Sequence, residues 1–144
     1  MAKAIKRLNQ TENVHEVLII DDDPNYLHLL QKMVEDEGKY LPILANGGKA
    51  ALKLLDDFTP DVILMDLLLE DVNGFELLER FNTDARLMHV PVIIITGSDL
   101  DNEQRSVLEN YSEQILSKWK VNKEDLLRNL QEMLTRMRGF QAVV

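Results

Sequence analysis

Three short runs of almost uninterrupted apolar residues are the most regular feature of the chain. They are Val17–Ile20, Val62–Met65 and Val92–Ile95, and each is rich in valine, isoleucine and leucine. A strand with one wet face alternates apolar and polar residues, whereas a strand covered on both faces is apolar throughout. The three runs therefore predict buried strands of a parallel sheet. Two weaker runs, Tyr40–Ala45 and Gln114–Ser117, are candidates for two further strands.

Segments with apolar residues at helical spacing separate these runs. One begins after Pro24 and another follows Gly74, and the remaining three cover Lys49–Asp57, Leu100–Asn110 and Lys123–Arg138. Strand and helix thus alternate five times along the chain. This alternation predicts an α/β, doubly wound fold, with parallel strands, right-handed crossovers and helices on both faces of the sheet.

The length of the chain, 144 residues, fits one domain. We expect an N-terminal extension at residues 1–15, a single domain at 16–138 and a short C-terminal tail at 139–144. The tail is too short for a separate output domain.

Composition narrows the classes of function. The formal net charge of −9 argues against non-specific binding to nucleic acid. The absence of cysteine excludes disulfides, thiolate metal sites and a cysteine nucleophile. The polar N-terminus has no signal-peptide pattern, and no apolar run approaches the ~20 residues of a membrane span. We therefore expect a cytoplasmic protein without a membrane partner.

Acidic, hydroxyl and amine side chains follow the ends of the predicted strands. In open α/β folds the ligand site lies beyond the carboxyl ends of the strands. The residues there are Asp21, Asp22, Asp23, Asp66, Thr96, Ser117 and Lys118. Adjacent carboxylates repel one another unless a cation lies among them, and ligands that are all oxygen favour Mg²⁺. A carboxylate can then attack phosphorus, while a hydroxyl and an ammonium group hold the phosphoryl oxygens.

Four segments that contain these residues resemble the signatures of response-regulator receiver domains: VLIIDDDPNYL, PDVILMDLLLEDVNGFELL, VPVIIITG and ILSK. The resemblance covers about residues 16 to 138. It implies a flavodoxin-like (βα)5 domain with a five-stranded parallel sheet in the order 2-1-3-4-5. It also implies Mg²⁺ ligands at Asp21, Asp22, Asp66 and the backbone carbonyl of Leu68, phosphorylation of Asp66, and phosphoryl-binding and switch roles for Thr96 and Lys118.

The sequence departs from the family pattern at three positions. Glu70 replaces a usual proline four residues after the acceptor, Ile115 replaces a usual aromatic residue three before the lysine, and Trp119 replaces a usual proline after it. These changes leave the residues of the phosphorylation chemistry in place. They concern how phosphorylation is read out. At the switch position of the family, Ile115 therefore departs from the usual aromatic residue.

The resemblance further implies a phosphoryl-accepting signalling module of two-component systems rather than an enzyme. Its phosphodonor would be a histidine kinase or a histidine phosphotransfer protein. The fourth and fifth helices are the candidate surface for switching and for a homodimer.

Two alternatives remain open. One is a receiver-fold protein-interaction module with little or no phosphorylation-driven switching, which Ile115 motivates. The other is a Mg²⁺-dependent, phosphatase-like hydrolase. That class usually has a second aspartate two residues after the nucleophile, where this chain has Leu68.

Several of these residues also have structural interpretations. Asp23 before Pro24 is typical of a helix N-cap. This interpretation is favoured over a role for Asp23 as a metal ligand. Gly74 after Asn73 is typical of a turn conformation. Trp119 either lies on the surface beside the site or packs under the last helix.

Overall fold

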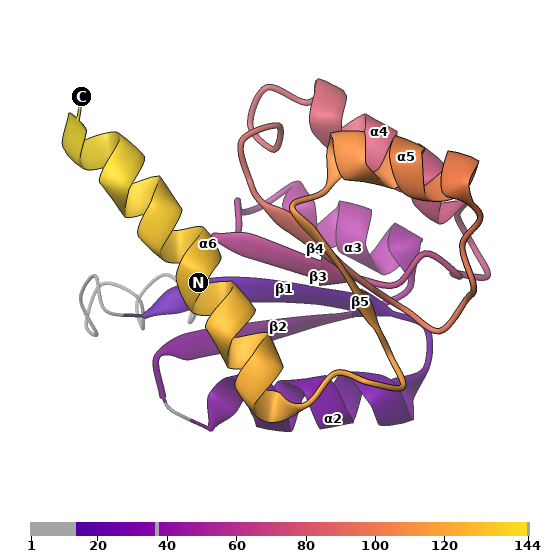
Figure 1. Cartoon of the computed structure of the whole chain (residues 1–144), viewed down its shortest axis with the longest axis horizontal. Helices are drawn as coiled ribbons and strands as arrows, with labels where there is room; N and C mark the ends of the chain where they lie inside the picture. Colours follow the sequence, from indigo (N-terminus) through magenta and orange to yellow (C-terminus); the bar gives the residue numbers. More distant parts are fainter. Residues whose placement is uncertain (1–13, 37, 144) are drawn as a thin grey trace.

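The computed structural model describes residues 14–36 and 38–143, and it describes side chains up to residue 136 (Figure 1). Most of the predicted N-terminal extension, residues 1–13, lies outside the described residues. The strands are β1 (His15–Asp21), β2 (Tyr40–Asn46), β3 (Val62–Met65), β4 (Val92–Thr96) and β5 (Gln114–Ser117). The helices are α2 (Pro24–Glu35), α3 (Gly48–Leu55), α4 (Gly74–Thr83), α5 (Asn102–Tyr111) and α6 (Lys123–Val143).

The five strands form one parallel sheet in the order β2-β1-β3-β4-β5, which confirms the predicted topology. In its register Ile20 on β1 pairs with Met65 on β3, and Thr96 on β4 pairs with Ser117 on β5. The carboxyl ends of β1, β3, β4 and β5 therefore lie together. This register brings residues from four separate sequence segments to one edge of the sheet.

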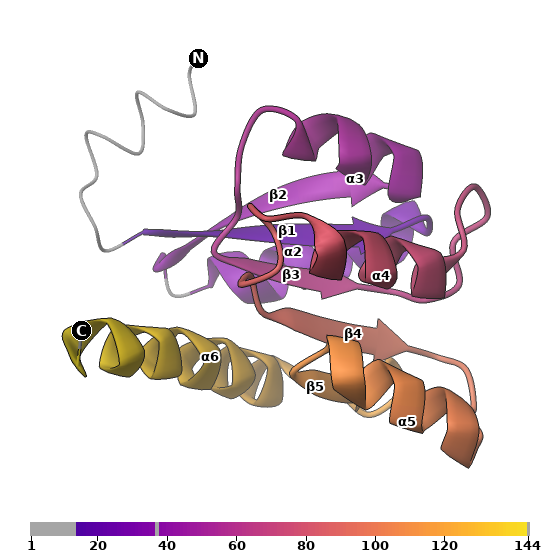
Figure 2. The same cartoon turned by 90° about the horizontal axis from the view of Figure 1, so that it is seen from above.

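The helices cover both faces of the sheet, as the alternating pattern predicted. One apolar cluster joins α2 and α6 to β1, β3 and β4, and a second joins α3, α4 and α5 to the other side of the same strands. Figure 1 shows α2 below the sheet and α3, α4 and α5 above it. Figure 2 shows α6 projecting beyond the strands toward the C-terminus. In the described part of the chain, no helix is both long and apolar enough to cross a membrane.

Three details of the elements differ from the sequence expectation. α6 does not end at Arg138 but continues to Val143, so it includes most of the predicted tail at 139–144. β1 extends beyond the apolar run Val17–Ile20 because its pairing with β2 continues over all seven residues from His15 to Asp21. Gly74 does not have a positive φ and is the first residue of α4. A Cβ there would lie 2.4 Å from the carbonyl oxygen of Leu67, so glycine is needed for close backbone approach and not for a turn conformation.

Candidate functional site

Three carboxylates meet at the carboxyl edge of the sheet. Asp21 is the last residue of β1, Asp22 begins the following loop, and Asp66 follows β3. One oxygen from each carboxylate lies within 4.8 Å of the others. Asp21 is 1% exposed and Asp66 is 5% exposed, whereas Asp22 is half-buried. The structure thus brings together the three predicted acidic ligands.

Lys118 lies against the two buried carboxylates. Its Nζ is 2.8 Å from Oδ2 of Asp21 and 3.0 Å from Oδ2 of Asp66. Burial disfavours the charged form of Lys118, but its hydrogen bonds to Asp21 and Asp66 outweigh burial and raise its pKa. The ammonium also lies 4.5 Å from the ring centroid of Tyr26 on α2. Lys118 is therefore held as a cation at the base of the site.

One ammonium group does not balance three carboxylates. Burial raises the pKa of Asp21, although its hydrogen bond to Lys118 opposes this rise. The remaining negative charge and the all-oxygen donors suit a hard divalent cation such as Mg²⁺. These residues therefore fit the metal that the family resemblance implies.

Asp23 has the structural role that its sequence context favoured. Its side chain accepts a hydrogen bond of 2.9 Å from the backbone N–H of Asn25 and caps α2, with Pro24 in the first turn. Its own N–H donates to Oδ1 of Asp21 at 2.9 Å. Asp23 thus orients the acidic loop without joining the carboxylate cluster.

Thr96 ends β4 and is buried at the same edge of the sheet. Its hydroxyl oxygen accepts a hydrogen bond of 3.3 Å from the Ser98 N–H, and its carbonyl accepts one of 3.0 Å from the Lys118 N–H. The backbone therefore ties the predicted switch threonine directly to the predicted phosphoryl-binding lysine.

Trp119 lies on the surface, so the packed alternative is wrong. It is 82% exposed, and its indole N–H donates to the Gly97 carbonyl at 3.3 Å. This contact links the loop after β5 to the loop after β4.

Ile115, by contrast, is half-buried on β5, pairs with Ile94 and packs against the cluster formed by α3, α4 and α5.

The loop after β3 carries Leu68 and Glu70. The Leu68 N–H donates to Oδ1 of Asp66 at 3.3 Å, while the residue itself is 64% exposed. The Glu70 N–H donates to Oδ2 of Asp22 at 2.9 Å. Both backbone groups thus contact carboxylates of the cluster.

Sequence reasoning missed Tyr26. Its hydroxyl is buried and has no hydrogen-bond partner in the described part of the chain, and burial raises its pKa to about 12. The only indication in the sequence that Tyr26 is partly buried is its position next to Leu27, at the border of the buried apolar face of the helix. That position does not reveal which end of the sheet the ring faces.

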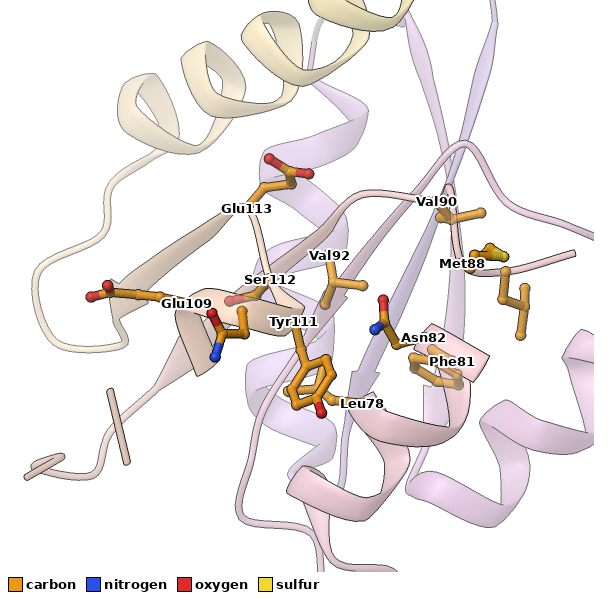
Figure 3. A pocket seen from close by; sticks show the side chains of 12 residues that line it. Leu78, Phe81, Asn82, Met88, Val90, Val92, Glu109, Tyr111, Ser112 and Glu113 are labelled. Carbon is orange, nitrogen blue, oxygen red and sulfur yellow. The ribbon is translucent and has the colours of Figure 1, made fainter. Parts of the chain in front are cut away.

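A cavity of about 210 Å³ lies away from this cluster, between the ends of α4 and α5 (Figure 3). Its lining includes Phe81, Val92, Tyr111 and Glu113. Val92 begins β4 and Glu113 precedes β5, so the cavity lies at the amino ends of these strands. None of the predicted site residues lines it.

The chain matches a known protein family and several curated relatives. The family model for the response regulator receiver domain matches residues 17–131. Protein PilH of Pseudomonas aeruginosa is 31% identical over 118 residues, which cover 82% of this chain and 96% of that protein. The polar-differentiation response regulator DivK of Brucella ovis is 31% identical over 102 residues, 71% of this chain and 82% of that protein.

The fold has close structural counterparts as well. A crystal structure of a CheY-like response regulator receiver domain protein from Methanospirillum hungatei has a TM-score of 0.79 and 27% identity, and the match covers 88% of this chain and 98% of that one. The family model spans most of the chain, and the sheet has the strand order that the family resemblance implied. This chain therefore belongs to the response regulator receiver domain family.

Proposed function

We propose that this chain accepts a phosphoryl group on Asp66 in a Mg²⁺-dependent reaction of two-component signal transduction. The observation that carries the proposal is the contact of Lys118 with both Asp21 and Asp66 within the three-carboxylate cluster. A half-buried ammonium group at 3.0 Å from the acceptor carboxylate is placed to hold phosphoryl oxygens. The neighbouring carboxylates supply the ligands for the cation.

In the proposed step a carboxylate oxygen of Asp66 forms a bond to phosphorus as the bond from phosphorus to the donor breaks. For a phosphohistidine donor, the leaving imidazole nitrogen takes up a proton from solvent. Lys118 turns its N–H groups from the free carboxylate to the phosphoryl oxygens, and the Thr96 hydroxyl donates to another of them. A Mg²⁺ ion held by Asp21, Asp22, Asp66 and the Leu68 carbonyl would neutralise charge on the transferred group.

The phosphodonor in this proposal is a histidine kinase or a histidine phosphotransfer protein, and the exchange takes place in the cytoplasm. The surface of the fourth and fifth helices, α5 and α6, would carry the signal onward and is the proposed homodimer face. Members of the receiver family are signalling modules, and we propose that the chain catalyses no turnover beyond its own phosphorylation and dephosphorylation.

Mass spectrometry tests the proposal directly. Wild-type protein incubated with acetyl phosphate and Mg²⁺ should gain the mass of one phosphoryl group. The gain should be absent in Asp66→Asn and absent when EDTA replaces Mg²⁺. Equal labelling of Asp66→Asn would show that another residue is the acceptor.

A second function, a receiver-fold interaction module without switching, is favoured by Ile115. This side chain is β-branched and packed against the core, so it has no aromatic ring to exchange between two positions. A phosphorylated protein whose partner affinity equals that of the unphosphorylated protein would support this alternative.

A further inference from the structure

A hydrogen bond joins two loops at the carboxylate cluster. The backbone N–H of Glu70 donates to Oδ2 of Asp22 at 2.9 Å, across 48 positions of sequence. Any residue except proline can supply this N–H. Proline is the residue that the family usually has at this position, so the bond depends on one of the departures of this chain.

Asp22 needs such a contact more than the other two carboxylates do. Asp21 and Asp66 are buried and are both held by Lys118. Asp22 is only half-buried, and its carboxylate is free to rotate unless a partner fixes it. A fixed carboxylate binds a cation more tightly because the ordering of the ligand has already occurred.

We propose that Glu70 is a positioning residue for the divalent cation and acts through its backbone N–H, which orients the carboxylate of Asp22 toward those of Asp21 and Asp66. The inference rests on the proposed function, because it concerns the same cation site.

The donor itself is well anchored. The next residue, Asp71, accepts hydrogen bonds of 3.0 Å from the backbone N–H groups of Gly48 and Lys49. Two positions before Glu70, the Leu68 N–H contacts Asp66. The loop is thus attached on both sides of Glu70. The Glu70 N–H therefore has a fixed position of its own and can orient the Asp22 carboxylate.

Calorimetric titration of the full chain with MgCl₂ measures the Mg²⁺ affinity. It separates the effect of the Glu70 backbone N–H on that affinity from the effect of the Glu70 side chain. Glu70→Pro removes both, whereas the matched control Glu70→Ala removes only the side chain and its charge. Because mutating groups that orient metal ligands typically weakens affinity by about 10- to 100-fold, and this bond is exposed, we expect about a tenfold loss in Glu70→Pro. Glu70→Ala should stay within about twofold of wild type. Equal affinities of the two variants would overturn the proposal.

A double-mutant cycle distinguishes positioning from distortion of the loop. In the Asp22→Ala background, Glu70→Pro should weaken Mg²⁺ binding no further, because the carboxylate on which it acts is gone. A full additional loss would show that proline acts through other ligands, such as the Leu68 carbonyl, and would overturn the proposal.

Hydrogen exchange provides a test that does not depend on the folding of Glu70→Pro. Without metal, the Glu70 amide should exchange at least about fivefold more slowly in wild type than in Asp22→Ala, as expected for a bond worth about 1 kcal/mol. Equal exchange rates would overturn the inference. If wild-type protein bound no Mg²⁺, the proposed function would fail; if it bound Mg²⁺ through Asp22 without any effect of Glu70→Pro, only the positioning role would fail.

Discussion

Leu68 presents an apolar side chain, 64% exposed, two residues after the proposed phosphoacceptor. In the family this position flanks the approach of the water that hydrolyses the phosphoryl group. A leucine cannot orient a water by hydrogen bonding, so we expect the phosphorylated protein to be long-lived. Leu68→Asn should lose the phosphoryl group about fivefold faster, the rate change that corresponds to one hydrogen bond worth about 1 kcal/mol.

The rate is measured by following the phosphorylated mass after the phosphodonor is removed. Leu68→Met is the matched control, because it keeps an apolar side chain of similar size. Loss of the phosphoryl group from wild type as fast as from Leu68→Asn would contradict the expectation.

Tyr26 provides a second test at the scale of single residues. A buried donor without a partner costs about 1–3 kcal/mol, and the Tyr26 hydroxyl is such a group in the described part of the chain. Tyr26→Phe removes the hydroxyl but keeps the ring beneath Lys118. Its free energy of unfolding, measured with urea, should therefore rise by about 1 kcal/mol.

The matched control for this gain is Tyr111→Phe, because the Tyr111 hydroxyl is not one of the buried unpartnered atoms. Its stability should be unchanged. A loss of stability in Tyr26→Phe would show that the hydroxyl is hydrogen-bonded in solution.

The residues at the carboxylate cluster differ in how far the sequence could predict their placement. Asp21, Asp66 and Lys118 follow apolar runs, and parallel strands place their carboxyl ends at one edge, so their proximity was predictable. Tyr26 was not predictable, because its position depends on the rotation of α2 about its axis. The bond from Glu70 to Asp22 depends on the path of a loop that no periodicity describes.

At the scale of elements, α3 begins with a cap supplied by another loop. Gly47 stands at its N-cap with a φ of 114° and has no side chain to accept a hydrogen bond. The carboxylate of Asp71 supplies the acceptor instead, to Gly48 and Lys49. Asp71→Ala should lower the free energy of unfolding by about 1 kcal/mol, the usual cost of losing an N-cap.

The effect of Asp71 should depend on pH. Hydrogen bonds from the N–H groups of Lys49 and Gly48 hold the pKa of Asp71 below its ordinary value of 3.8. Because the pKa is lower in the folded protein, the charged form stabilises the fold above that ordinary value, and this stabilisation is lost as pH falls through the lowered pKa. Urea unfolding should thus give a constant difference from Asp71→Ala between about pH 5 and 8, and a smaller one below about pH 4.

Asp57→Ala is the control for Asp71→Ala, since Asp57 is an exposed acidic residue beyond the opposite end of α3. It should cause no comparable loss at any pH. A difference between wild type and Asp71→Ala that stays constant to pH 3 would rule out the carboxylate as its source.

The existence and order of the elements followed from hydrophobic periodicity, but their ends did not. β1 gains His15, Glu16 and Asp21 through pairing with β2, a long-range interaction that its own residues do not reveal. Gly74 shows the same limit, because the contact with Leu67 that requires a glycine joins the two ends of a loop. Local pattern thus predicts which element forms, while neighbours determine where it stops.

For the whole molecule, the question is how a phosphoryl group on Asp66 would affect the proposed switching surface on α5 and α6. Ile115 is packed and stiff, so the coupling should run through the two loops that Trp119 joins. Hydrogen exchange with and without the phosphoryl mimic beryllofluoride should change at residues 96–104 and 117–122 and remain nearly constant in the rest of β5.

Strong changes centred on Ile115 would show that a side-chain switch persists there without an aromatic ring. No change in either loop would favour the non-switching interaction module. Asp66→Asn treated with beryllofluoride is the control, because the mimic should not bind without the acceptor carboxylate.

The exposed indole of Trp119 determines how this protein can be followed by optical methods. It is the single tryptophan of the chain, and it is close to fully exposed when folded as well as when unfolded. The wavelength of its emission should therefore shift little on denaturation, and an intrinsic-fluorescence melt would show the unfolding transition with only a small change in wavelength. Its intensity, however, should respond to any movement of the Gly97 carbonyl. The native sequence thus contains a label-free reporter of one loop junction, and circular dichroism is the better measure of global folding.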